Sequence, residues 1–139
     1  MSYMAAQTLL KALLVTCGSL GASNVTEGDL RVLDSGLTNT AVIFPGILPV
    51  MDLATLVRVR EYEAIVDLFT KFVDDTAYST FGTLRDAVIA TIMGGRDMSG
   101  TYFITALASD GEPTELFDKQ GAGPFFVNQR FRLVIQEQV

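Results

Sequence analysis

The sequence predicts an α+β fold, in which two helices pack on one face of a mostly antiparallel sheet. Two observations predict it. Segments with the two-residue period of a strand outnumber the two segments with the three-to-four-residue period of a helix. The last strand alternates between apolar and polar residues, which is typical of an antiparallel strand with one face in water. The 139 residues suit one domain, 1–139, that is long enough to bury a core.

The first predicted element is a helix over residues 2–16, ended by Gly18. We expect Cys17 to be a small buried apolar residue, because the sequence contains no histidine that could activate a thiol. No Lys or Arg precedes the apolar run before Cys17, and Lys11 interrupts it, so we expect no cleaved signal peptide and no membrane span. The apolar face of this helix consists of Ala6, Leu10, Leu13, Leu14 and Cys17.

A polar, glycine-containing connection over 18–28 leads to two short predicted strands, 30–33 and 40–44. Pro45 ends the second strand because proline lacks the N–H that a sheet needs. The next residues are apolar and are expected to form a loop. Such a loop either covers the core or forms a contact surface with a partner. The contact candidates in this segment, called the 45–51 segment below, are Pro45, Ile47, Leu48, Val50 and Met51.

A long strand over 57–72 and a helix that ends at Gly94 and Gly95 form the predicted centre of the fold. A phase change in the apolar pattern before Tyr62 predicts a bulge or bend in the strand. We expect Asp74, Asp75 and Thr76 to cap the helix. Gly82 suggests a close approach of helix and sheet, and the two terminal glycines suggest a left-handed helix end. The apolar helix face consists of Ala77, Phe81, Leu84, Val88 and Ile92.

Two further strands, 101–108 and 125–137, are predicted to form a hairpin around a long loop over 112–124. The loop contains glycines, prolines and mixed charges. It is the second place where a partner could bind. The contact candidates in it, called the 115–117 segment below, are Glu115, Leu116 and Phe117.

Catalytic chemistry finds little support in the sequence. Without histidine, the commonest general base and metal ligand is missing, and one cysteine excludes thiolate zinc clusters. Glu61 and Glu63 should point to one face of a strand, as a shared cation or an acid–base pair requires, but such pairs are more often solvated and face arginines. The net charge of −6 disfavours general nucleic-acid binding. We therefore expect no enzyme, no cofactor and no metal.

The order of elements resembles the tail-terminator, or tail-completion and neck, proteins of long-tailed bacteriophages. The resemblance rests on the leading helix, on three stretches of sequence and on their order. The stretches are Arg60-Glu61-Tyr62-Glu63-Ala64-Ile65-Val66-Asp67-Leu68-Phe69, then Leu84-Arg85-Asp86-Ala87-Val88, and finally Arg130-Phe131-Arg132-Leu133-Val134-Ile135.

The resemblance implies a structural virion protein, made in the host cytoplasm, that forms a homo-hexameric ring on the tail tube. Such a ring stops polymerisation of the major tail protein and offers a docking face to the head-side connector. DNA passes through the lumen of the tail without specific binding, and an acidic or neutral lining would suit this passage. A ring also needs a heterologous interface that closes on itself.

Three alternatives remain at the level of sequence. Another neck, head-closure or minor tail protein could share this outline. A ferredoxin-like regulatory domain that binds a small molecule would also have a sheet and two helices, and it predicts a pocket. An enzyme that uses Glu61 and Glu63 is the third.

Overall fold

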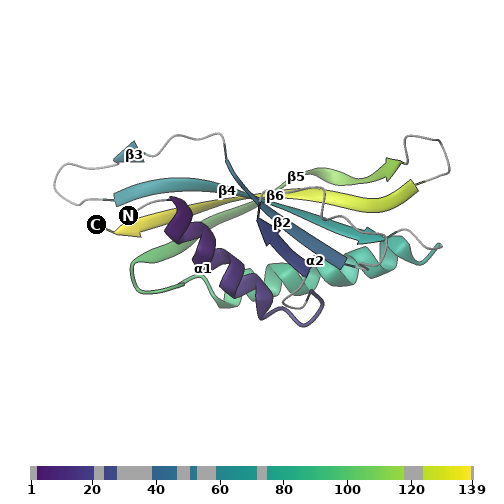
Figure 1. Cartoon of the computed structure of the whole chain (residues 1–139), viewed down its shortest axis with the longest axis horizontal. Helices are drawn as coiled ribbons and strands as arrows, with labels where there is room; N and C mark the ends of the chain where they lie inside the picture. The colour runs from purple at the N-terminus through teal and green to yellow at the C-terminus, as the bar shows by residue number, and fades with distance from the viewer. Residues whose placement is uncertain are drawn as a thin grey trace.

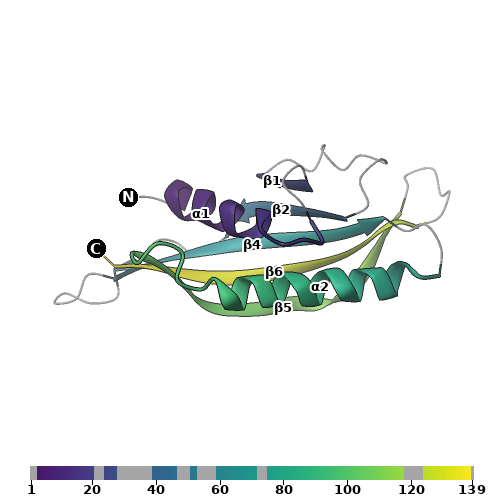
Figure 2. The same cartoon turned by 90° about the horizontal axis from the view of Figure 1, so that it is seen from below.

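The computed structural model describes residues 3–20, 24–27, 39–46, 51–52, 59–71, 75–117 and 124–138. In this part of the chain two helices cover one face of a six-stranded sheet, as Figures 1 and 2 show. The strand order is β1-β2-β4-β6-β5, and β3 pairs with β4 beside this path. All pairings are antiparallel except that of β1 with β2. The predicted α+β class, with both helices on one face, is confirmed.

Helix α1 (Tyr3–Val15) leads the chain and buries the predicted face. Ala6, Leu10 and Leu14 are fully buried, and the Cys17 thiol is buried and free just beyond the helix end. Leu13 is only half-buried, because it turns toward the end of the second helix. The interpretation of Cys17 as a packed apolar residue is therefore confirmed.

Three short strands follow. β1 (Val25–Glu27) lies in the stretch that was predicted to be a polar connection, so that prediction was wrong at these residues. β2 (Asn39–Pro45) contains the predicted strand 40–44 and extends it by one residue at each end. β3 (Met51–Asp52) pairs with Arg60 and Glu61. The predicted strand 30–33 lies outside the described residues.

Strand β4 (Val59–Lys71) is the centre of the sheet. It pairs with β2 on one side and β6 on the other, and its pairing with β6 is continuous from Val59 to Lys71. No bulge interrupts it, so the predicted bend does not lie within this strand. Tyr62, Ala64, Val66 and Leu68 face the helices and join the main core.

Helix α2 (Ala77–Gly94) packs its predicted apolar face on this core. Its N-cap residue is Thr76, whose side chain makes no capping hydrogen bond, and Asp75 is exposed, so the predicted side-chain cap is not seen there. Asp74 lies outside the described residues. Gly95 ends the helix at φ −116°, which is not the predicted left-handed conformation. A methyl group at Gly95 would collide with Leu13, so close contact between the helices favours glycine there.

The last two strands form a long hairpin. β5 (Tyr102–Phe117) is twice as long as the predicted strand 101–108, and β6 (Pro124–Gln138) closely matches the predicted 125–137. The predicted loop over 112–124 is therefore wrong in its first part. β5 keeps pairing with β6 through register shifts at Ile104/Ala106, Asp110/Thr114 and Leu116/Phe117. These bulges accommodate the glycine and proline that suggested a loop.

Candidate assembly surface

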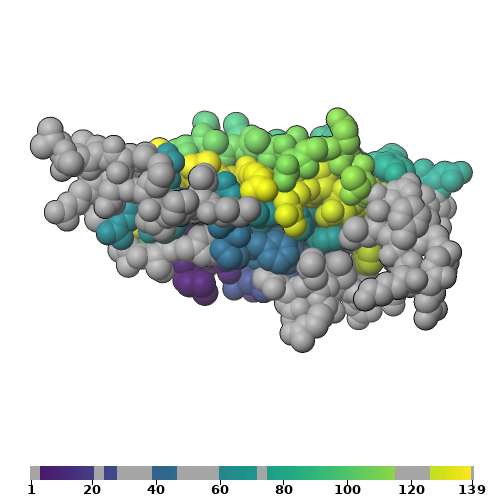
Figure 3. Space-filling view, turned by 90° about the horizontal axis from the view of Figure 1, so that it is seen from above, coloured from purple at the N-terminus to yellow at the C-terminus, as the bar shows by residue number. Residues whose placement is uncertain are grey.

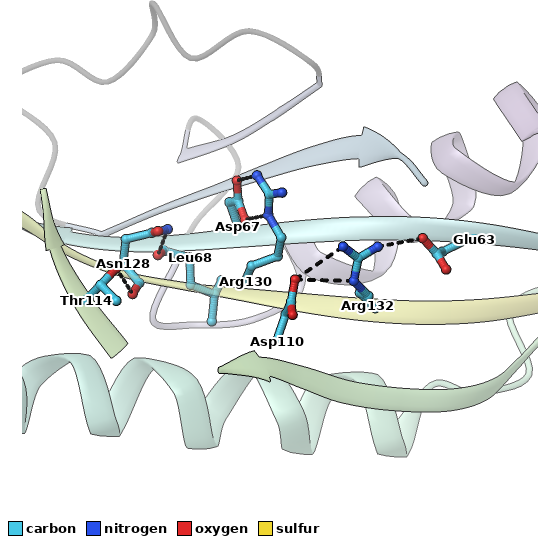
Figure 4. A network of polar contacts seen from close by, with 8 residues as sticks. All are labelled: Glu63, Asp67, Leu68, Asp110, Thr114, Asn128, Arg130 and Arg132. Carbon is cyan, nitrogen blue, oxygen red and sulfur yellow. Dashed lines mark hydrogen bonds and ion pairs between the residues drawn. The ribbon is translucent and has the colours of Figure 1, made fainter. Parts of the chain in front are cut away.

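The sheet face turned away from the helices, called the outer face below, carries a ladder of ion pairs (Figure 4). Asp67 and Arg130 lie directly opposite each other in β4 and β6. Arg130 Nε donates to Asp67 Oδ1 at 2.8 Å and Nη2 donates to Oδ2 at 3.0 Å. This two-point contact is the strong geometry for arginine and carboxylate, and it raises the pKa of Arg130 above its ordinary value.

Arg132 extends the ladder across three strands. Its Nη1 lies 2.8 Å from Glu63 Oε1 in β4, and its Nη2 lies 3.2 Å from Asp110 Oδ2 in β5. Nearby, Asn128 Nδ2 donates to the carbonyl of Leu68 at 3.0 Å. The charged groups at the middle of the outer face therefore bind one another, and they tie β4, β6 and β5 together.

Glu61 and Glu63, the pair considered for catalysis, do share the outer face. Gln136 Nε2 donates to Glu61 Oε1 at 3.0 Å, while Glu63 is paired with Arg132. The expectation that Glu63 faces an arginine is confirmed. The expectation of a solvated site is wrong for Glu63, because β4 is an interior strand and this residue is buried. Both carboxylates serve the cross-strand contacts of the sheet.

A second polar contact lies on the helix side of the sheet. Glu137 is fully buried, and Tyr62 Oη donates to its Oε1 at 2.5 Å. Burial raises the pKa of Tyr62 to about 12, and the hydrogen bond to the carboxylate adds to this shift. Glu137 Oε2 has no hydrogen-bond partner among the described residues. This pair anchors the end of β6 to the start of β4.

The structure places the predicted contact residues in two groups. Pro45 is exposed at the end of β2 opposite Ala64, and Met51 lies in β3 opposite Glu61. Met51 is therefore in a strand and not in the predicted loop. Ile47, Leu48 and Val50 lie outside the described residues. Glu115, Leu116 and Phe117 belong to the end of β5 and not to a loop, as Figure 1 shows.

Met51 and the 115–117 segment lie at opposite ends of the sheet, whereas Pro45 lies level with the middle of β4. Met51 is level with Glu61, whereas Leu116 pairs with Phe126, which in turn pairs with Lys71. The ten residue-to-residue steps of β4 from Glu61 to Lys71 correspond to about 34 Å along the strand, at roughly 3.4 Å per step. In Figure 1, β3 and the end of β5 accordingly lie at the two ends of the long axis.

The middle of β5 is a surface that the sequence analysis did not single out. β5 is the last strand of the sheet, and Figure 3 shows it along one side of the outer face, next to β6. Thr105, Ala106, Ala108 and Ser109 are exposed, and Leu107 is half-buried. The signal was present, because this run is uncharged and short of large side chains.

An apolar groove runs beside this edge, between α2 and β5. Its volume is about 560 Å³, and Arg96 is the one charged residue of its lining. Met93, which is 48% exposed, borders it from the helix. The regulatory-domain alternative predicts a pocket, and this groove is one place in the described part of the chain where a small molecule could bind. That alternative stays a prediction. The apolar lining consists of Ile89, Met93, Ile104, Ala106, Leu107 and Phe131.

The described part of the chain contains neither a metal-binding cluster nor a membrane-spanning helix. No group of three or more histidine, cysteine, aspartate or glutamate side chains there is arranged to hold a metal ion. Neither α1 nor α2 is long and apolar enough to cross a membrane, and no other described segment is such a helix.

Comparison with known proteins gives a similar structure but no family. No family model matches the sequence, and no curated protein matches it. A protein of solved structure, which carries only a serial designation, is 16% identical and matches over 96% of both chains with a TM-score of 0.48.

Proposed function

We propose that this protein is a structural assembly protein of a phage tail, of the tail-terminator kind. It forms a homo-hexameric ring that caps the tail tube, stops its polymerisation and joins it to the head-side connector. DNA passes through the ring without specific binding. The protein acts in the virion after its synthesis in the host cytoplasm.

The observation that carries this proposal is the placement of the two contact segments. A closed ring needs two different patches on each subunit, so that one patch meets the other on the next subunit. The 45–51 and 115–117 segments supply such patches, because Met51 and Leu116 are separated by about ten residues of β4. Between them, the cross-strand ion pairs of Asp67 and Glu63 brace the sheet as a rigid spacer.

The chemistry of the outer face supports the same proposal. On the outer face, Asp67, Glu63 and Glu61 are bound to Arg130, Arg132 and Gln136, respectively. Groups engaged in this way stabilise strand pairing and present no free acid–base pair to a substrate. A role in assembly uses the rigidity of this sheet directly.

Polymerisation of tail-tube protein in the presence of this chain tests the proposal. We expect shorter tubes with a ring of this protein at one end, and a ring mass of six subunits when tube protein is present. Electron microscopy of particles that lack the protein should show overlong or headless tails. Normal virions without it, or a chain that stays monomeric with and without tube protein, would refute the proposal.

A further inference from the structure

The outer edge of β5 is protected at both ends but not in its middle. Near the start of the strand, Ile104 N donates to the carbonyl of Arg96 at 2.8 Å and Asp97 forms a bridge with Phe103, so the chain covers its own edge there. Farther along, the register shift between Asp110 and Thr114, with Gly111 at φ +89°, bends the edge. Between these devices lie only residues 105–109.

Natural sheets usually protect open edges with charges, prolines or bulges. Residues 105–109 carry no charge and no proline, and beyond the register shift at Thr105 the residues from Ala106 to Ser109 pair regularly with β6. Their order is Thr-Ala-Leu-Ala-Ser, which reads nearly the same in both directions. In an antiparallel pair of two such segments, Thr105 faces Ser109, Ala106 faces Ala108, and Leu107 faces its own copy.

We propose that this edge pairs with the same edge of a second copy of the chain, antiparallel about a two-fold axis at Leu107. An isologous contact of this kind requires a self-complementary patch, and the sequence of residues 105–109 is one. The sheet of one copy then continues into the sheet of the other. Main-chain hydrogen bonds satisfy the edge groups that β5 presents.

Shape at the ends of the segment fits the same register. Continuing the pairing would place Asp110 of the second copy opposite Ile104, where the chain around Arg96 already occupies the edge. Regular strand geometry of the second copy's β5 ends at this residue, because its register with β6 shifts between Asp110 and Thr114. The two strands therefore separate where continued pairing would collide.

Charge and apolar surface are complementary as well. Glu112 follows the paired segment and Arg96 lies beside Ile104 at its other end, so antiparallel pairing puts these two exposed and oppositely charged residues of the two copies at the same end of the contact. Leu107 lines the groove between α2 and β5, so its cross-strand copy joins the two apolar grooves on one face of the sheet. The exposed Met93 side chains border this joined surface.

The contact differs from the end-to-end contacts of the proposed ring in residues and in symmetry. It involves five paired residues on each side, so it belongs at the weak end of protein interfaces, with a dissociation constant of about 10 μM to 1 mM. Because it needs no tube protein, it succeeds or fails independently of the proposed function.

Sedimentation equilibrium of the full chain alone, up to about 1 mM, tests the pairing. We expect a reversible monomer–dimer equilibrium. Amide hydrogen exchange of residues 105–109 should slow as the fraction of dimer rises with concentration. Ala108→Lys, which puts a charge on the edge, should weaken the dimer at least about tenfold. Ala90→Lys, the same change on the exposed side of α2, is the matched control and should leave it unchanged.

Charge reversal provides an independent test that keeps the edge intact. Arg96→Glu and Glu112→Arg should each weaken the dimer, and the double variant should restore it. These variants decide the matter if Ala108→Lys fails to fold by circular dichroism. Three results would each overturn the proposal. The chain could be monomeric at every concentration, Ala108→Lys and Ala90→Lys could dimerise equally, or the charge reversals could leave the dimer unchanged.

Discussion

At the scale of single residues, three glycines show that the need for glycine at a position depends on neighbouring side chains, which the sequence does not reveal. Gly82 was predicted to permit a close approach of helix and sheet, but a methyl group there would meet no atom within 4 Å. The crowded positions are Gly46, which follows Pro45, and Gly95, which ends α2. A methyl group at Gly46 would collide with Glu63, and one at Gly95 would collide with Leu13. Sequence identifies the glycines but not the side chains that approach them.

Gly46→Ala should destabilise the protein by about 1–3 kcal/mol, because the new methyl group overlaps Glu63 Cβ and Cγ, which lie close to the main chain and cannot turn away. Gly82→Ala is the matched control. It should stabilise the fold by up to about 1 kcal/mol through helix propensity. Urea unfolding of the two variants measures both effects, and a Gly46→Ala protein as stable as wild type would contradict the described contact.

Tyr62 predicts a loss of stability at alkaline pH. Its pKa rises from 10.0 to about 12 on folding, so above pH 10 the unfolded chain releases a proton that the folded protein retains. Stability is complete below pH 10 and falls as the pH rises toward 12. Relative to Tyr62→Phe, the wild type should lose about 1 kcal/mol by pH 11 and about 2 kcal/mol by pH 12.

Unfolding free energies of the two proteins at pH 9, 11 and 12 give this difference, and the remaining tyrosines cancel because both proteins contain them. The same variant removes the hydrogen bond to the buried Glu137, so at pH 7 it should be less stable by about 1–3 kcal/mol. Parallel pH curves for the two proteins would show that Tyr62 does not keep its proton as described.

At the scale of elements, periodicity predicted α1, β2, β4, α2 and β6 within a few residues. These elements have a buried face long enough to impose a clear pattern, as Leu10 and Leu14 or Val66 and Leu68 illustrate. The sequence did not predict β1, because a strand of three residues within a polar run is too short to show a two-residue period. The sequence did not predict the second half of β5, because Gly111 and Pro113 are typical of a loop. In the structure these residues lie within the strand, because β5 continues to pair with β6 on both sides of them.

A signal for the longer β5 was nevertheless present. The predicted strand 125–137 has an amphipathic pattern along its whole length, and its neighbour in a hairpin must be about as long to pair with it. The predicted strand 101–108 was too short for that. The candidate site shows the same limit, because the ion-pair ladder depends on the pairing register of β4, β6 and β5, which no local pattern encodes.

The ladder predicts unequal effects of its two central partners. The side chain of Asp67 is 5% exposed, while that of Arg130 is 43% exposed. Arg130→Ala leaves a buried carboxylate without its arginine and should cost about 2–4 kcal/mol. Asp67→Ala leaves a guanidinium that reaches water and should cost about 1 kcal/mol. The double variant should cost less than the sum, and equal effects of the two single changes would contradict the described burial.

At the scale of the whole molecule, the body is long, and β3, which contains Met51, and the end of β5, which contains Leu116, lie at its two ends (Figure 1). The symmetry of an interface determines how variants combine. In a heterologous ring each subunit uses one end against the other end of its neighbour, so damage to either end stops closure. In an isologous contact a single damaged patch abolishes every contact that it makes. Mixing variants therefore distinguishes the two kinds of assembly.

Met51→Asp and Leu116→Asp place a charge at opposite ends of the sheet, because Met51 pairs with Glu61, whereas Leu116 pairs with Phe126, which pairs with Lys71. Neither variant alone should form rings or stop tube growth, since burying an unpaired carboxylate in an interface is costly. Mixed together, they should form a two-subunit complex, because the intact 115–117 end of one meets the intact 45–51 end of the other, and this complex cannot grow. Native mass measurement with and without tube protein detects it. Rings formed by either variant alone would place the interface elsewhere, whereas an equal mixture that stays monomeric would show that the two ends do not meet.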